Sequence, residues 1–172
     1  FEVVPSHFDE DVIPFFGDPG EFACLLSKGK SDSLFDRFPD SVILTADTIV
    51  YLDGKSYGKP RNAIEATQTL QALSGRWHSV YTGVTLRAGE RSFEQFEESK
   101  VLFNPLTSFQ IEEYVRTQVW ADKAGGYAIQ NGGSLMIKKL DGCVYNVIGL
   151  PINSVRELFS YIGIDLWHYL KK

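Results

Sequence analysis

The sequence lacks the features that mark several large protein classes. It has only two cysteines, Cys24 and Cys143, which lie far apart and outside any C-x-x-C pair, so a disulfide framework is not indicated. We expect both to be reduced, with at least one in the core. No apolar run approaches the ~18 residues of a membrane span, and no signal peptide is recognisable. These absences favour a cytoplasmic protein that does not insert into a membrane.

The sequence also lacks an excess of basic residues. Its net charge of −5 argues against a nucleic-acid binder, which usually carries a basic patch. A phosphate-bearing substrate stays possible, because a few local lysines are enough to hold one. The three histidines are scattered without an H-E-x-x-H pair, and no G-x-S-x-G occurs. The sequence therefore argues against a zinc enzyme and against an α/β-hydrolase.

What is present is the composition of an ordinary globular domain. Of the 172 residues, 44% are hydrophobic and 23% are charged, which suits one buried core and is too apolar for disorder. No repeat, linker or low-complexity stretch divides the chain, so we expect a single domain over residues 1–172. Residues 1–4 have the pattern of a strand already under way, and we expect that an N-terminal piece precedes them in the natural protein.

Periodicity and capping residues predict helices interleaved with hairpins. Helix starts are indicated at Asp18, followed by Pro19 and Glu21, and at Asn62, followed by Glu65. The expected helices cover 18 to about 38, 62–73, a stretch from 107 or 108, and 153–161. The expected strands cover 1–4, 41–52, 78–87, 91–103, 134–140 and 143–147. This order favours an α/β or α+β domain with a mixed sheet.

One carboxylate stands inside an apolar stretch. Asp47 follows the run 42–46 and precedes 48–50, and a carboxylate in such a strand is costly unless it is paired or used. Ligands of open α/β sheets bind beyond the carboxyl ends of strands, which makes Asp47 a candidate catalytic residue. The alternative is that the strand ends there and Asp47 caps a turn. The pattern alone leaves both interpretations open.

Two lysines are candidates for holding a phosphate. Lys59 stands between Gly58 and Pro60, which allow and then fix unusual backbone angles, so the loop would present a cation rigidly. This is not a P-loop, and an ordinary surface turn is the alternative. Lys30 lies beside the apolar stripe of the first expected helix. It either reaches a ligand or lays its stem on the apolar surface with its charged head in water.

Two further polar residues are candidates with equally plain alternatives. Glu10 lies in the acidic cluster 9–11, which is either solvated or shares a divalent cation with Asp47. Mg²⁺ sites commonly use one or two carboxylates plus substrate phosphates. Gln130 closes a glycine-bearing loop, and its amide carries both donors and an acceptor suited to a base edge. A surface position would explain Gln130 equally well.

Several short motifs stand in a characteristic order along the chain. They are 46–50 (ADTIV), 58–60 (GKP), 73–75 (LSG) with His78 and 81–84 (YTGV), 122–130 (DKAGGYAIQ) and 146–151 (NVIGLP). Together they resemble one family, the Maf (septum-formation-inhibitor-like) nucleotide pyrophosphatases. Leu26 and Ser27, followed by Lys30, also fit the family's first helix. Each motif is short, but in this order and spacing, over residues 1 to about 159, the set is highly specific.

The resemblance implies a fold and a reaction. The fold is an elongated α/β domain around a curved mixed sheet flanked by helices, similar to the inosine-triphosphate pyrophosphatases, with a central cleft between two lobes. The reaction cleaves a nucleoside triphosphate to the monophosphate and pyrophosphate, with a divalent cation such as Mg²⁺ or Mn²⁺. The Ala-Asp-Thr form at 46–48 resembles the branch that acts on dTTP and UTP. A homodimer is also expected from the family.

The resemblance also implies roles for particular residues. Asp47 matches the catalytic acid, and Glu10 with Asp47 would hold the metal. The polar positions at the phosphates are matched by Lys30 and Lys59. Positions tied to substrate preference are matched by Thr48 and Gln130.

One part of the family pattern has no counterpart in this sequence. The family begins with a strand and a Ser-x-Ser-x-Arg-Arg loop that holds the triphosphate, and we expect this segment to be missing from the sequence. Two other functions stay open: a non-catalytic nucleotide-binding or regulatory protein linked to cell division, and an enzyme of the sister type that removes deaminated purine nucleotides. The Ala-Asp-Thr and Gly-Lys-Pro motifs favour the first interpretation over this sister type.

Overall fold

The computed structural model describes residues 1–170 and confirms the expected α/β class. The strands of this part of the chain are β1 (Val42–Leu52), β2 (Lys55–Tyr57), β3 (Trp77–Ala88), β4 (Arg91–Phe103) and β5 (Ile137–Asp141). The helices are α1 (Pro19–Phe35), α2 (Ala63–Leu73), α3 (Ser108–Arg116), α4 (Val144–Ile148) and α5 (Ile152–Ser160). Short 3-10 turns are η1 (Glu10–Val12), η2 (Val119–Asp122), η3 (Ala124–Gly126), η4 (Gly133–Leu135) and η5 (Leu166–Tyr169). None of the described helices is long and apolar enough to cross a membrane.

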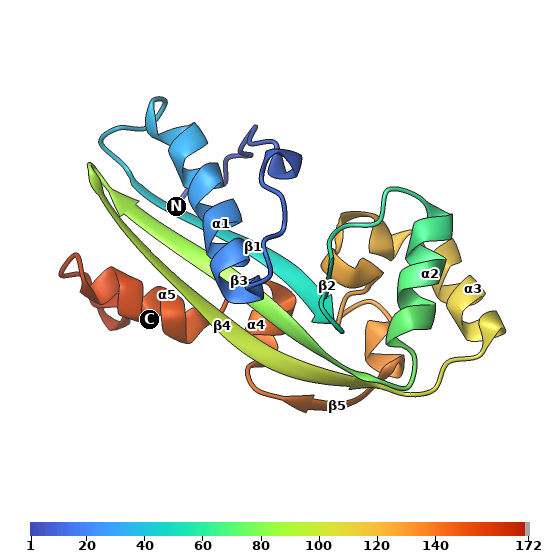
Figure 1. The fold of residues 1–172 in the computed structure, drawn as a ribbon. Coiled ribbons are helices and arrows are strands. Elements are labelled where there is room, and N and C mark those ends of the chain that lie inside the picture. The colour runs from blue at the N-terminus through green and yellow to red at the C-terminus, as the bar shows by residue number, and fades with distance from the viewer. Residues whose placement is uncertain (171–172) are drawn as a thin grey trace.

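The strands form one twisted sheet in the order β2-β1-β3-β4-β5 (Figure 1). Every pairing among the described residues is antiparallel, so the expectation of a mixed sheet is wrong. Two of these pairings follow from local turns: β1 and β2 are joined by the two-residue turn Asp53-Gly54, and β3 and β4 by Gly89-Glu90. Both Asp53 and Gly54 have positive φ, as a tight hairpin turn requires.

Two expected strands are absent from the structure. Residues 1–4 pair with no strand, and the side chains of Phe1 and Val3 are exposed. The strand expected over 143–147 is replaced by helix α4, which begins at Val144. Its Asn146 is fully buried and hydrogen-bonds to β3 and β4, a tertiary contact that outweighs the local preference of Val and Tyr for strands. The strand expected over 134–140 begins later, at Ile137.

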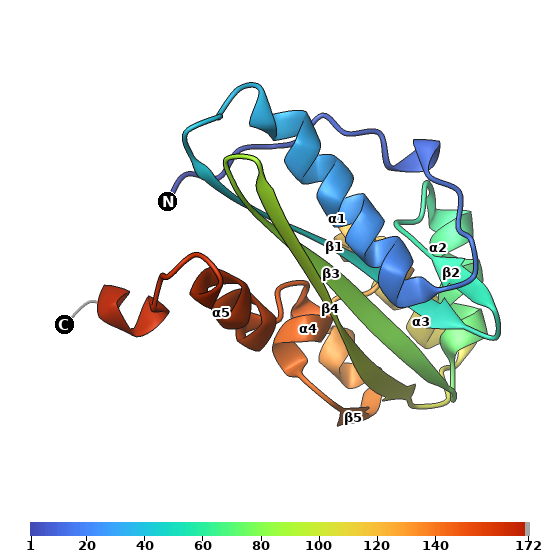
Figure 2. The ribbon, with the colours of Figure 1, turned by 60° about the vertical axis from the view of Figure 1, so that its left-hand side comes forward.

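Helix α1 lies directly on one face of the sheet, and α5 packs against the opposite face (Figure 2). Asp18 caps α1 by accepting a hydrogen bond from the Glu21 amide at 2.9 Å, as expected. Contact with the sheet is close at Gly83 of β3, where an added Cβ would meet the backbone carbonyl carbon of Ala23 at 2.3 Å. Glycine at this position therefore sets the height of α1 above the strands.

The largest core cluster lies at the end of the sheet where α2 and α3 pack beside β2 (Figure 1). It includes Leu70, Val80, Phe103 and Tyr127, which are all nearly or completely buried. Beside this cluster, the Nε2 atom of His78 and the Tyr127 hydroxyl are 2.8 Å apart. Both cysteines are free and only half-buried, so the expectation of a cysteine in the core is wrong.

Candidate active site

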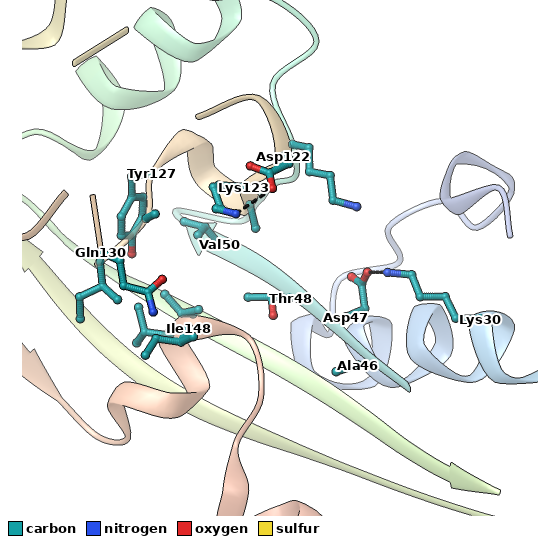
Figure 3. A pocket seen from close by; sticks show the side chains of 16 residues that line it. Lys30, Ala46, Asp47, Thr48, Val50, Asp122, Lys123, Tyr127, Gln130 and Ile148 are labelled. Carbon is teal, nitrogen blue, oxygen red and sulfur yellow. Dashed lines mark hydrogen bonds and ion pairs between the residues drawn. The ribbon is translucent and has the colours of Figure 1, made fainter. Parts of the chain in front are cut away.

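The uncovered edge of β1 forms the floor of a pocket. β2 pairs only with Val50, Tyr51 and Leu52, so residues 42–49 of β1 have a partner strand on one side only. Successive side chains of a strand point to opposite faces, and at an uncovered edge both faces reach the same space. Asp47 therefore faces α1 while Thr48 faces α4, and both line one pocket (Figure 3).

Four charged side chains form a chain of ion pairs at one end of this pocket. Lys30 of α1 hydrogen-bonds to Asp47, and its ammonium lies 2.9 Å from Glu10. Glu10 in turn accepts from Lys59 at 2.9 Å. Two carboxylates and two ammonium groups thus alternate, and the cluster is neutral overall. Asp47 lies within β1 and caps no turn, and Lys30 does not extend into solvent, so the plain alternatives for these two residues are excluded while their functional roles stay predictions.

Burial and charge act in opposite directions on these groups. Asp47 is 6% exposed, and burial raises the pKa of its carboxyl despite the opposing charge and hydrogen bond of Lys30. Burial would also raise the pKa of Glu10, but Lys30 and Lys59 together outweigh it and hold that pKa below its ordinary value. For Lys30, burial lowers the pKa, and the two carboxylates overcome this and raise it. Burial thus shifts Asp47 toward its protonated form, as suits a group that accepts a proton, whereas the two lysines favour the ionised form of Glu10.

The N-terminal segment is seated so that Glu10 reaches the lysines. Its Phe8 ring packs on Gly29 of α1, where an added Cβ would lie 2.4 Å from the ring. Asp9 then caps the short turn η1 by accepting from the Asp11 amide at 3.1 Å. Glu10, the first residue of η1, is held beside Lys30 by these two contacts.

The other end of the pocket is built from the loop that follows α3. Figure 3 shows Tyr127 and Gln130 across from Thr48, with Ile148 of α4 beside them. The loop is anchored at several points: the Gly125 amide donates to the Gly58 carbonyl at 3.0 Å, and the Ala128 amide donates to the Tyr114 hydroxyl at 3.0 Å. The first of these bonds ties the loop to the turn that carries Lys59. This wall is mostly uncharged.

The sequence of the whole chain was also compared with known proteins. A family model described as "Maf-like protein" matches residues 1–162. The chain belongs to the Maf-like family. Among its curated relatives, one from Pyrococcus furiosus named "dTTP/UTP pyrophosphatase" is 42% identical over 100% of this chain and 88% of the relative. Another with that name, from Chlamydia caviae, is 40% identical over 99% of this chain and 87% of the relative. One from Chlamydia muridarum, named "Nucleoside triphosphate pyrophosphatase", is 38% identical over 99% and 87%.

The residues expected from the Maf-like motifs come together in space. The five that line the one pocket are Lys30, Asp47, Thr48, Lys59 and Gln130. Glu10 is joined to the same place through both lysines. Their individual roles stay predictions, because no ligand contact tests them.

Other pocket residues were not singled out from the sequence. Asp122 and Lys123 lie at its rim, where they pair with each other at 2.8 Å. Both belong to the 122–130 motif, so the sequence pattern that could have identified them was present. Val80 and Val147 also line the pocket, but they look like any core valine in the sequence.

The carboxylates of this Maf-like pocket can be compared with the donor sets that divalent cations use in proteins. Among residues 1–170, no group of three or more His, Cys, Asp or Glu side chains could hold a metal ion. Two carboxylates do converge, since Glu10 and Asp47 bind the same ammonium group. Mg²⁺ is commonly bound by one or two carboxylates together with waters and substrate phosphates, so this donor set suits Mg²⁺ or Mn²⁺ brought with a triphosphate.

Proposed function

We propose that this protein hydrolyses a nucleoside triphosphate, dTTP or UTP, to the monophosphate and pyrophosphate. The observation that carries the proposal is the cluster Lys30–Asp47–Glu10–Lys59 at one end of a pocket whose other end is neutral. The names of the Maf-like relatives, which are pyrophosphatases of nucleoside triphosphates, support the same reaction and the choice of dTTP and UTP.

The charged end suits the triphosphate. An incoming triphosphate would compete with Glu10 and Asp47 for the two lysines, and these would then offset the charge that develops on the phosphate oxygens. Water attacks the α-phosphorus, Asp47 takes the water's proton, and the bond from the α-phosphorus to the oxygen bridging the α- and β-phosphates breaks. That oxygen leaves with pyrophosphate. Burial of Asp47, which raises the pKa of its carboxyl, makes it a stronger proton acceptor than an exposed aspartate.

A divalent cation completes this scheme. Glu10 and Asp47 are the residues that would hold it, and when bound it would neutralise phosphate charge and lower the pKa of a bound water. Once the triphosphate takes up the lysines, both carboxylates are released from their ion pairs and their oxygens become free to bind the cation. The binding of substrate and cation should therefore depend on each other.

Three further features complete the proposal. The neutral wall with Thr48 and Gln130 would contact the nucleoside. The protein would act in the cytoplasm on free nucleotides and not on nucleic acid. It would do so as a homodimer, which sedimentation or light scattering would detect as twice the chain mass.

The first experiment is a pyrophosphate-release assay with a panel of nucleoside triphosphates. The full-length protein is incubated with each nucleotide and Mg²⁺ or Mn²⁺, with a parallel sample in excess chelator. We expect release from dTTP and UTP, none in chelator, and a loss of about 10³-fold in kcat for Asp47→Asn. Thermal unfolding checks that this variant is folded.

Each other outcome has a definite meaning. Nucleotide binding without pyrophosphate release would replace the enzyme with a binding or regulatory protein. Preference for deaminated purine nucleotides would move the protein to the sister type. Near-normal turnover by Asp47→Asn would overturn the role given to that carboxylate.

A further inference from the structure

A buried chain of hydrogen bonds runs from the pocket wall into the protein. Thr48 Oγ1 lies 2.9 Å from Thr82 Oγ1 on the neighbouring strand β3. Thr82 Oγ1 lies 2.9 Å from the backbone carbonyl oxygen of Asn146 in α4. Thr82 and Asn146 are fully buried, so water cannot replace the bond between them. Only its first member, Thr48, reaches the pocket (Figure 3).

The carbonyl at the inner end is firmly held. The Asn146 side-chain amide donates to the Val80 carbonyl and to Ser99 Oγ, each at 3.0 Å. Its backbone carbonyl also accepts from the Gly149 amide at 2.9 Å. These bonds fix the position of the oxygen that faces Thr82.

The direction of every bond in the chain follows from counting protons. A carbonyl oxygen can only accept, so Thr82 must donate its single hydroxyl proton to Asn146. If Thr82 donated to Thr48 instead, two buried oxygens would face each other at 2.9 Å with no proton between them. Thr82 can therefore only accept from Thr48, and the proton of Thr48 is committed to this internal bond.

We propose that Thr82 is a positioning residue that fixes Thr48 as a hydrogen-bond acceptor toward the nucleotide, and so selects bases with a ring N–H. With its proton turned inward, Thr48 Oγ1 offers only lone pairs to the pocket. Access to that oxygen is kept open by Gly149, where an added Cβ would lie 3.3 Å away. The inference rests on the proposed function, because it assumes that a nucleoside lies along this wall.

The polarity separates uracil and thymine from cytosine. Uracil and thymine carry a proton on ring nitrogen N3, whereas the same atom of cytosine is an acceptor. An N–H facing Thr48 gains a hydrogen bond, and an acceptor there places two lone pairs against each other. Sites built around a fixed hydrogen-bond direction reject the mismatched ligand more strongly than apolar pockets reject one of the wrong size.

The test compares uridine and cytidine nucleotides in the wild-type protein and in Thr82→Val. The substitution keeps the side-chain shape and removes the acceptor, so the Thr48 hydroxyl can turn and donate. We expect the wild-type preference for UTP over CTP in kcat/KM to fall about tenfold or more in Thr82→Val. Thr82→Ser keeps the hydroxyl and should retain the preference. Calorimetric affinities for UMP and CMP are measured on the same proteins.

A matched control separates recognition from folding. Thr85→Val removes another fully buried hydroxyl of β3, one that bonds to Ser27 at 2.7 Å on the opposite face of the sheet. This variant should be destabilised to a similar extent and keep the wild-type preference. The same preference in Thr82→Val as in wild type, or no preference in wild type, would overturn the inference. No pyrophosphate release, with the UMP-over-CMP affinity ratio lowered only in Thr82→Val, would sink the proposed function and leave the inference standing.

Discussion

The two ends of the pocket are built on opposite principles, although adjacent residues of one strand supply both. At the Asp47 end, four charged groups neutralise one another through ion pairs that a ligand can exchange. At the Thr48 end, hydroxyl and amide groups form fixed bonds with buried partners. Under the proposed function, the first end would release its partners and bind new ones, whereas the second would keep its arrangement. Chemistry on a phosphate needs the former, and discrimination between similar bases needs the latter.

The largest effect is expected from a substitution that disrupts the charged end. Lys30 holds both carboxylates, so Lys30→Met should lower kcat/KM for dTTP by about 10²-fold to 10³-fold through lost stabilisation of phosphate charge. Steady-state pyrophosphate release measures this. Lys28→Met is the control, because Lys28 lies on the same helix but pairs with Asp32 and Glu94, away from the pocket. Equal activity in the two variants would remove Lys30 from the site.

The second prediction uses pH to test His78, the buried partner of Tyr127 in the neutral wall. Burial lowers the pKa of His78 from 6.5 to about 4, so the folded protein binds fewer protons there than the unfolded chain between these values. The free energy of unfolding is therefore not reduced by His78 above pH 6.5, and it falls as the pH drops from 6.5 toward 4. We expect His78 to cost about 2 kcal/mol in the free energy of unfolding between pH 7 and pH 5.

Urea unfolding at the two pH values measures this loss. His78→Phe should show a shallower pH dependence than the wild type, because it cannot take up the proton in the unfolded state. His168→Phe is the matched control, since His168 lies in η5 near the C-terminal end of the chain. An unchanged slope in His78→Phe would contradict the prediction.

The smallest expected effect separates stability from function at the charged end. The side chains of Lys59 and Glu10 are 48% and 34% exposed, so water screens their ion pair. Glu10→Gln should therefore change the free energy of unfolding by less than about 1 kcal/mol. The same variant should need more Mg²⁺ for half-maximal activity, because it loses a carboxylate that would bind the cation. Activity is titrated against Mg²⁺, with Asp11→Asn as the neighbouring control. An unchanged Mg²⁺ requirement would exclude Glu10 as a metal ligand.

The same contrast separates what the sequence could predict from what it could not. The β3–β4 hairpin was predicted to within about a residue, because a turn signal and alternating side chains are local information. Helix α4 was missed because its residues favour a strand locally, and contacts with β3 and β4 decide its form. Local pattern left the role of Asp47 open, and only the resemblance to a family pointed to the charged cluster.

The neutral end was harder to predict for a physical reason. The hydrogen-bond partner of Thr82 lies 64 residues away in the chain, and nothing near Thr82 in the sequence indicates it. A buried threonine in a strand looks like ordinary packing until its partner is located. Fixed polar networks of this kind are visible only in three dimensions.

Because Gly83 contacts the backbone of α1 so closely, a larger residue there would tilt that helix about the point of contact. Lys30 lies seven residues beyond Ala23, or roughly 10 Å along the axis at about 1.5 Å per residue. A tilt of about ten degrees at the contact would move Lys30 by ~2 Å over that distance, enough to separate a hydrogen-bonded pair. An extra methyl group at position 83, which lies outside the pocket, would thus separate Lys30 from Asp47.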